Sequence, residues 1–84
     1  MISLGLCMIV KDEEAVLARI LEPMSRIVDR IYICDTGSSD KTKEIAAAFT
    51  SEIYDFPWKD DFSAARNFIT EKADTDYWMW LDAD

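Results

Sequence analysis

The chain has 84 residues, half of them apolar, and it carries 17 acidic against 9 basic side chains, a formal net charge of −8. That charge argues against binding to nucleic acid or to anionic lipid, since both attract basic surfaces. The chain contains no histidine, so a cysteine nucleophile with a histidine base is excluded. The composition suits one small packed domain, and no apolar run reaches membrane-spanning length.

The first part of the chain has the pattern of a strand followed by a helix. Residues 2–10 form a nearly continuous apolar run, which is typical of a strand covered on both faces. Acidic residues follow at 12–14, where the first turn of a helix favours negative charge. Apolar residues then recur at helical spacing and predict a helix over about 13–24, with Pro23 distorting or ending its last turn.

A second strand and helix follow in the same order. Residues 30–35 form a short apolar run that closes with a carboxylate, Asp35. The small residues at 36–40 predict a turn, in which Asp40 is the best N-cap candidate. The spacing of apolar residues predicts a helix over 41–49.

The last part of the chain predicts two further strands around a third helix. The strands are expected at 52–56 and 77–82, and the helix, capped by Asp61 or Ser63, runs to about Ala73. The expected buried stripe of this helix is Phe62, Ala65, Ile69 and Ala73. The order βαβαβαβ, with crossovers of this length, predicts an α/β fold with right-handed parallel units.

Two pairs of side chains are expected to lie in the core. Cys7 and Cys34 each lie within an apolar strand-like run and show no metal-binding spacing. We expect buried, reduced thiols, which are typical of a cytoplasmic protein. Trp78 and Trp80, on the last strand, are expected to pack in the core rather than to stack on a ligand.

Polar side chains gather where the predicted strands end, which is where open parallel sheets bind their ligands. Asp82 and Asp84 stand two residues apart, so in an extended strand their carboxylates point to the same side. Paired carboxylates suit a divalent metal that also binds phosphate, although two aspartates can equally cap a strand at the surface. With Gly5 and Gly37 as its only glycines, the chain offers no glycine-rich dinucleotide fingerprint and no P-loop.

Four patches of the sequence carry a resemblance to a known family. They are MIVKDEE at 8–14, DTGSSDKT at 35–42, FSAARN at 62–67 and WLDAD at 80–84. In order and spacing they resemble the N-terminal half of a family-2 glycosyltransferase domain with the GT-A fold. The run 58–67 is especially similar to bacterial members that glycosylate cell-envelope sugars or peptides.

The resemblance implies a fold and a domain organisation. We expect a three-layer α/β sandwich whose four-stranded, mostly parallel sheet has the order 3-2-1-4, with helices on both faces. Residues 1–84 would be the N-terminal donor-binding half of the domain and a fragment of a longer protein, because the chain stops just past a strand without a closing helix. The uncovered edge and the Trp-rich last strand predict self-association, which sedimentation of the dilute chain would test.

The resemblance also implies a metal site and a donor. Asp82 and Asp84 match the family's Asp-x-Asp motif, in which the carboxylates hold Mg²⁺ or Mn²⁺ on the donor's diphosphate and Asp82 also contacts the ribose. The expected partner is a nucleotide-diphosphate sugar, uridine-linked. The expected reaction is sugar transfer to a saccharide, lipid or peptide acceptor in the cytoplasm, with the cytoplasmic face of the membrane as the alternative location of the parent protein.

Further residues match positions that line the nucleotide in this family. Asp35 matches the acid that accepts a hydrogen bond from the base, which suits a uracil N–H. Val10 and Glu13 bound the loop that lines the nucleotide, and Arg66 matches the arginine near it. Asp12 departs from the pattern, because the family commonly has asparagine there, and its extra charge is expected to alter this contact.

The general base of the inverting members belongs to the acceptor-binding half, so the catalytic residues are not expected in this chain and the fragment alone is expected to be inactive. The alternative is a non-catalytic α/β binding module or a receiver-like regulatory module, in which acids such as Asp55 would serve a Mg²⁺-assisted phospho-acceptor. A receiver would need a fifth strand and a lysine near its metal site, and neither is available. Metal-dependent binding of uridine diphosphate separates these hypotheses.

Overall fold

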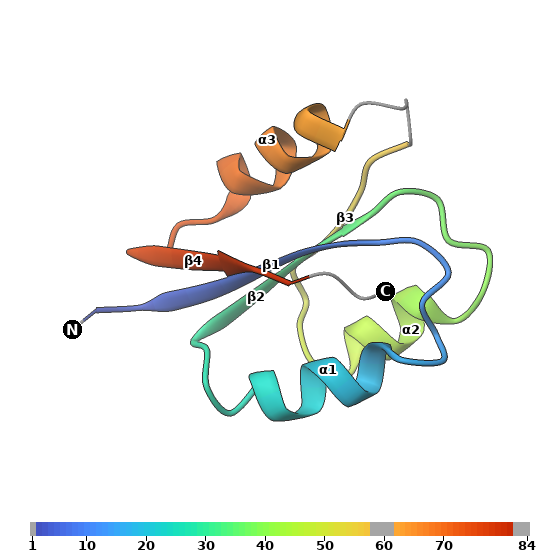
Figure 1. Ribbon diagram of the computed structural model, residues 1–84, viewed down its shortest axis with the longest axis horizontal. Coiled ribbons are helices and arrows are strands. Elements are labelled where there is room, and N and C mark those ends of the chain that lie inside the picture. Colours follow the sequence, from blue (N-terminus) through green and yellow to red (C-terminus); the bar gives the residue numbers. More distant parts are fainter. Residues whose placement is uncertain (1, 58–61, 82–84) are drawn as a thin grey trace.

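The computed structural model describes residues 2–57 and 62–81 (Figure 1). Within these ranges strands and helices alternate as predicted. The strands are β1 (Leu4–Val10), β2 (Arg30–Asp35), β3 (Ile53–Asp55) and β4 (Tyr77–Trp80), and the helices are α1 (Leu17–Met24), α2 (Thr42–Ala47) and α3 (Phe62–Lys72).

The four strands form one parallel sheet in the order β3-β2-β1-β4, which confirms the predicted order. The register pairs Val10 with Asp35 and Asp35 with Asp55. It also pairs Gly5 with Trp78 and Cys7 with Trp80. Because β3 lies beside β2 rather than beside β1, the sheet does not have the 2-1-3 order of a receiver domain.

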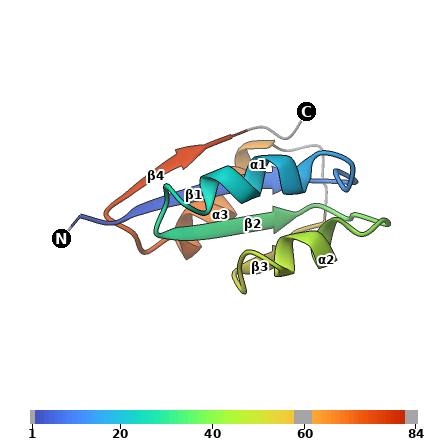
Figure 2. The ribbon, with the colours of Figure 1, turned by 90° about the horizontal axis from the view of Figure 1, so that it is seen from below.

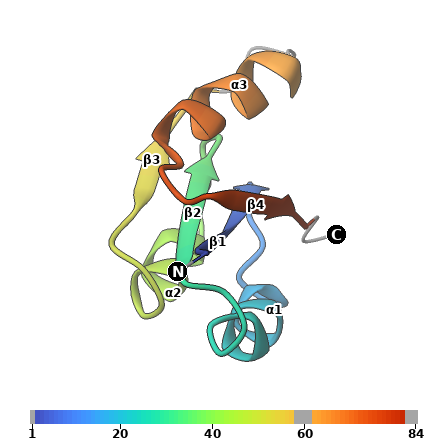
Figure 3. The same ribbon diagram turned by 90° about the vertical axis from the view of Figure 1, so that its left-hand side faces the viewer.

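The sheet is covered on both faces, as predicted (Figure 3). Alternate residues of each strand point to opposite faces, which divides the core into two clusters. One lies under α1 and α2, and its buried members include Leu6, Met8, Val10, Leu17, Leu21, Ile31, Ile33 and Ala46. The other lies under α3 and contains Cys7, Tyr32, Cys34, Ala65 and Ile69.

The first helix begins later than the sequence predicts. It starts at Leu17 instead of near residue 13, because residues 14–16 form a turn and Val16, with φ of −124°, is the N-cap. Asp12, which precedes this turn, adopts a left-handed conformation with φ of 52°. The N–H groups of Glu13 and Glu14 are bound by the side chains of Thr42, the first residue of α2, and of Asp40 in the β2–α2 loop. Pro23 lies inside the last turn, and the helix ends at Met24 as expected.

The prediction that both tryptophans of β4 pack in the core is wrong for Trp78. Trp80 packs against the cluster under α3, whereas Trp78 is 46 % exposed and Tyr77 is 62 % exposed. The register explains the difference, since Trp78 pairs with Gly5, which has no side chain to pack against. β4 is one of the two edge strands of the described sheet, with β3 at the other edge, and self-association through β4 stays a prediction. In the described part of the chain, no helix is both long and apolar enough to cross a membrane.

The two thiols should be unreactive in the folded chain. Cys7 and Cys34 are fully buried, and desolvation raises the pKa of each thiol to about 11, with the charge of Asp35 adding to the effect on Cys34. A pKa raised from 9.0 to about 11 lowers the thiolate fraction at neutral pH roughly 100-fold, in addition to the steric protection. We expect labelling by a disulfide reagent at pH 7.5 to be at least 100-fold slower than in the urea-unfolded chain. Rapid labelling without denaturant would contradict this.

Gly5 is required by the close approach of the α3–β4 connection. A Cβ atom at this position would lie 2.6 Å from Thr75 Oγ1 and 2.9 Å from Tyr32 Cε2. We expect Gly5→Ala to lower the free energy of unfolding by about 1–3 kcal/mol in urea titrations, because the contact overpacks the core. In a Thr75→Ala background the same change should cost less. Equal costs in the two backgrounds would contradict the proposed clash.

Candidate functional site

The loops that follow β1 and β2 lie side by side at the carboxyl edge of the sheet (Figure 2). Parallel pairing brings the ends of all the strands to this edge, and α3 also begins there. The structure therefore gathers the described candidate residues, Val10, Glu13, Asp35 and Arg66, at one end of the sheet.

Asp35 is the most unusual of these residues, because it is a carboxylate that is only 2 % exposed. Its Oδ1 atom accepts hydrogen bonds from the N–H groups of Gly37 at 2.9 Å and Ser38 at 2.8 Å. The turn that delivers these donors depends on Gly37, whose φ of 113° is unfavourable for other residues. Asp35 Oδ2 is buried without a hydrogen-bond partner, which is costly unless a ligand supplies a donor.

The β1–α1 and β2–α2 loops are joined by hydrogen bonds in both directions. Thr36 donates its N–H and its hydroxyl to the carbonyl of Val10, at 3.0 and 3.2 Å. The N–H of Asp12 donates to Ser38 Oγ at 2.9 Å, and Asp12 Oδ1 accepts the N–H of Ser39 at 2.7 Å. Backbone donors of each loop thus face acceptors of the other, which allows several acidic residues to lie close together.

The left-handed conformation of Asp12 explains its residue type. Asp and Asn tolerate positive φ better than other residues with a side chain, and both offer an Oδ1 acceptor. Asparagine, which the resemblance leads us to expect here, would therefore keep the observed geometry. The added charge of Asp12 is partly balanced by the N–H of Ser39.

A second link between the loops is made by Asp40 and Thr42. Thr42 is fully buried, and its Oγ1 atom accepts the N–H of Glu13 at 2.8 Å while donating to Asp40 Oδ1. Asp40 also accepts the N–H groups of Thr42 at 2.9 Å and Glu14 at 3.3 Å. Desolvation raises the pKa of Asp40, but these hydrogen bonds outweigh it and lower the pKa overall. The helix N-cap falls on Lys41, one residue later than predicted, yet Asp40 still binds the first helical N–H.

Glu13 and Val10 contribute to the edge in different ways. The main chain of Glu13 is engaged, since its carbonyl accepts the N–H groups of Val16 and Leu17. No hydrogen bond or ion pair to another described residue engages its carboxylate, so it is available to a ligand. Val10 is 1 % exposed and lies in the core, and its carbonyl is taken up by Thr36. Nucleotide contact by either residue stays a prediction.

The sequence analysis missed one cation at this edge. Lys43 Nζ lies 2.7 Å from Asp55 Oδ1, joining α2 to the end of β3. The hydrogen bond to Asp55 raises the pKa of Lys43, and the charges of Asp55 and Asp35 add to the effect. Lys43 thus supplies positive charge near the buried carboxylate. Its position directly after Thr42 is visible in the sequence, but its pairing with Asp55 depends on the placement of β3 beside β2.

Arg66 lies on α3, with its guanidinium carbon 4.8 Å from the centre of the Trp80 ring. The guanidinium group thus packs over an aromatic face, and its planar fork of donors has the geometry that suits phosphate or carboxylate. This contact holds Arg66 beside the end of β4, immediately before the predicted metal motif. Asp82 and Asp84 themselves lie outside the described residues. Among the residues that are described, no group of three or more acidic or cysteine side chains could hold a metal.

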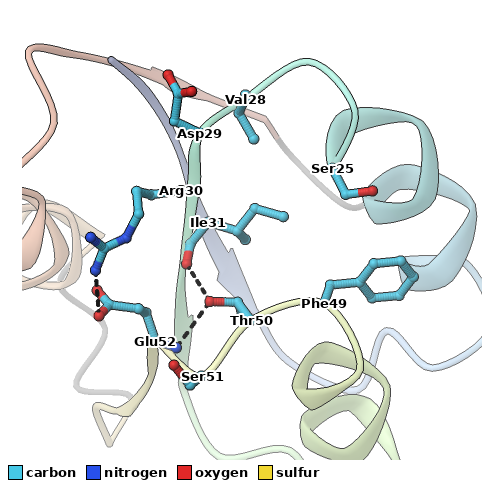
Figure 4. A pocket seen from close by; sticks show the side chains of 9 residues that line it. All are labelled: Ser25, Val28, Asp29, Arg30, Ile31, Phe49, Thr50, Ser51 and Glu52. Atoms are coloured by element: carbon cyan, nitrogen blue, oxygen red, sulfur yellow. Dashed lines mark hydrogen bonds and ion pairs between the residues drawn. The ribbon is translucent and has the colours of Figure 1, made fainter.

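A hollow of about 310 Å³ lies at the opposite, amino-terminal edge of the sheet (Figure 4). Its polar groups bind to one another and to the backbone. Thr50 Oγ1 donates to the carbonyl of Ile31 at 2.8 Å and accepts the N–H of Glu52 at 2.9 Å. Arg30 pairs with Glu52 at 2.8 Å. With these groups satisfied, the hollow is a weaker ligand site than the carboxyl edge.

Comparison with known proteins identifies relatives along nearly the whole chain. The model of the family described as Glycosyl transferase family 2 matches residues 6–84. A TPR repeat-containing protein from Synechococcus elongatus is 43 % identical over 84 residues, which are 100 % of this chain and 21 % of that protein. An uncharacterized glycosyltransferase from Rickettsia typhi is 29 % identical over 76 residues, 90 % of this chain and 26 % of its own length. The chain thus spans only a minor part of these curated relatives.

A solved structure shares the fold. The crystal structure of glucosyl-3-phosphoglycerate synthase from Mycobacterium tuberculosis, in complex with Mg²⁺ and uridine diphosphate, superposes with a TM-score of 0.83. The match covers 98 % of this chain and 33 % of that protein, at 19 % sequence identity. The likeness supports the predicted GT-A-type, Rossmann-like α/β fold.

The conformation of Asp12 leads to a graded prediction for stability. Asp12→Asn keeps both the favourable residue type and the acceptor, so its free energy of unfolding should lie within about 0.5 kcal/mol of the original chain. Asp12→Gly loses only the acceptor, whereas Asp12→Ala also forces alanine into a left-handed conformation and should cost about 1–2 kcal/mol. Urea unfolding followed by circular dichroism measures the series. If Asn proved as costly as Ala, charge rather than geometry would be the reason for Asp12.

Proposed function

The chain belongs to glycosyl transferase family 2, and on this basis we propose that it is the donor-binding part of a glycosyltransferase that uses a nucleoside-diphosphate sugar. The observation that carries the proposal is the Asp35 carboxylate, buried at the carboxyl edge with one oxygen lacking a donor. A nucleotide base with an N–H group supplies the missing donor. Burial makes such a charged hydrogen bond strong and selective.

Uracil is the base that fits this carboxylate best. Its N3–H is a donor, whereas the corresponding nitrogen of cytosine is an acceptor and would face Asp35 Oδ2 unfavourably. The related fold of known structure was solved with uridine diphosphate, which supports the same choice here. Lys43 offsets the negative charge of the neighbouring acids, and Glu13 offers a free carboxylate at the rim for a ribose hydroxyl.

The diphosphate is expected at the end of β4. Asp82 and Asp84 would hold Mg²⁺ or Mn²⁺ there, and the oxygen ligands suit either ion. When bound, such an ion neutralises the charge that develops on the leaving nucleoside diphosphate. Arg66, stacked on Trp80, supplies a further cation on the same side and binds a phosphate or acceptor oxygen.

The remainder of the reaction is assigned to other parts of a longer protein. We place the general base and the acceptor site, for a saccharide, lipid or peptide, outside residues 1–84, so the chain alone binds its donor but does not turn it over. A cytoplasmic donor pool and a role in building bacterial cell-envelope glycans fit the resemblance of residues 58–67. The receiver-like alternative is disfavoured by the β3-β2-β1-β4 order.

Calorimetric titration with uridine diphosphate tests the proposal, with Mg²⁺ or Mn²⁺ and then with chelator. We expect metal-dependent binding that Asp82→Ala abolishes or weakens at least tenfold. Asp35→Asn retains the Oδ1 acceptor but turns the free oxygen into a donor, so it should weaken uridine diphosphate about 10–100-fold, the equivalent of one charged hydrogen bond. The same variant should gain relative affinity for cytidine diphosphate.

Asp29→Asn is the matched control for charge. Asp29 accepts the N–H of Leu4 at 2.7 Å at the amino-terminal edge, so its change should leave nucleotide affinity within about twofold. Equal affinity of the original chain and Asp35→Asn for uridine diphosphate would rule out the assigned base contact. Repeating the titration on a longer protein that contains this domain would then tell whether a site exists at all.

A further inference from the structure

Thr42 is a buried polar side chain that connects two loops expected to bind the same ligand, although no role in ligand binding has been assigned to it. Thr42 is the first residue of α2, and its hydroxyl accepts the N–H of Glu13 from the β1–α1 loop and donates to Asp40 in the β2–α2 loop. Asp40 in turn accepts the N–H of Glu14. Three connected hydrogen bonds therefore hold the backbone of residues 13 and 14 against Asp40 and Thr42.

We propose that Thr42 is a positioning residue that fixes the Glu13 loop against the Asp35 loop, so that the nucleoside half of the donor site is formed before the ligand arrives. The inference rests on the proposed function and deepens it. A preformed site avoids the entropy cost of ordering the loops on binding. In a mobile site this cost makes the binding free energy less favourable. Thr42 acts through Glu13 and makes no assigned contact with the nucleotide.

The hydrogen-bond pattern explains why a threonine suits this position. Glu13 follows the left-handed Asp12 and precedes α1, so its N–H has no partner within its own helix. Thr42 Oγ1 accepts this N–H at 2.8 Å. Because Thr42 is 0 % exposed, water cannot take the place of its hydroxyl group. Removal of the hydroxyl leaves the Glu13 N–H and one Asp40 bond unsatisfied, and the loop is then free to move away from Asp35.

The chain contains a matched control at the other edge of the sheet. Thr50 Oγ1 also accepts a backbone N–H, from Glu52, and donates to an oxygen, the carbonyl of Ile31 (Figure 4). Thr42→Val and Thr50→Val thus each remove one acceptor of a backbone N–H and one hydroxyl donor, which serves the Asp40 carboxylate at the candidate site and the Ile31 carbonyl away from it. Thr42→Ser keeps the hydroxyl and is the rescue variant.

Two readouts on the 84-residue chain test the proposal. The first is amide hydrogen exchange at Glu13, corrected for global stability. We expect it to be at least tenfold faster in Thr42→Val, near the original rate in Thr42→Ser and unchanged in Thr50→Val. The second is affinity for uridine diphosphate with Mg²⁺, which should fall about tenfold in Thr42→Val, an equivalent of about 1.4 kcal/mol. Thr42→Ser and Thr50→Val should both stay within twofold.

Each departure from this pattern overturns a stated part of the argument. Unprotected Glu13 in the original chain, or faster exchange in Thr42→Val without loss of affinity, overturns the positioning role. An equal loss of affinity in Thr50→Val means that the effect is one of general stability, which also overturns it. If the original chain shows protected Glu13 but binds no uridine diphosphate, the proposed function falls for this chain and the positioning role falls with it. The loop geometry would still stand in that case.

Discussion

The parallel register of β1 and β2, in which Val10 lies opposite Asp35, is the constraint on which the rest of the structure depends. Because of this register, β1 and β2 end next to each other, so the two loops that follow them lie side by side and can form hydrogen bonds with each other. A shift of one residue would turn Asp35 away from the α1–α2 face and carry Ile31 and Ile33 out of the core beneath it. The hydrophobic alternation of β2 therefore also determines where the buried carboxylate lies.

Concentrating acids at this edge has an electrostatic cost that the backbone offsets. Asp12, Asp35 and Asp40 each accept one or more main-chain N–H groups, mostly from the neighbouring loop or the following turn. Such bonds stabilise the ionised carboxylates without cationic side chains, which the chain has in short supply. Lys43 is a cationic side chain that does pair with an acid at this edge, and its bond to Asp55 places its positive charge beside the outer strand β3. With Asp35 Oδ2 lacking a donor, the arrangement suits a ligand that brings its own donor or cation.

Periodicity and turn composition were enough to predict the order of elements, the two-sided core and the carboxyl edge as the place where the candidate residues meet. The start of α1 was not predictable from its own segment, because the competing partners of Glu13 and Glu14 come from residues 40 and 42. Exposure of Trp78 likewise depends on the register with Gly5, which composition does not reveal. The Lys43–Asp55 pair joins two elements whose separation is known only once β3 is placed beside β2. In all three cases the missing information was which residues, far apart in the sequence, lie next to each other in the fold.

The two halves of the candidate site are built from different parts of the fold. The proposed base and ribose region lies in the loops after β1 and β2, on the α1–α2 side, where hydrogen bonds join the β1–α1 loop to the β2–α2 loop and the start of α2. The proposed phosphate region lies at the end of β4 and along α3 on the other side, where Arg66 rests on Trp80. β1 is the element they share, since it pairs with both β2 and β4. Because the two regions share few side chains, nucleoside recognition and diphosphate recognition should be separable energetically, and substitutions in the two regions should act nearly additively.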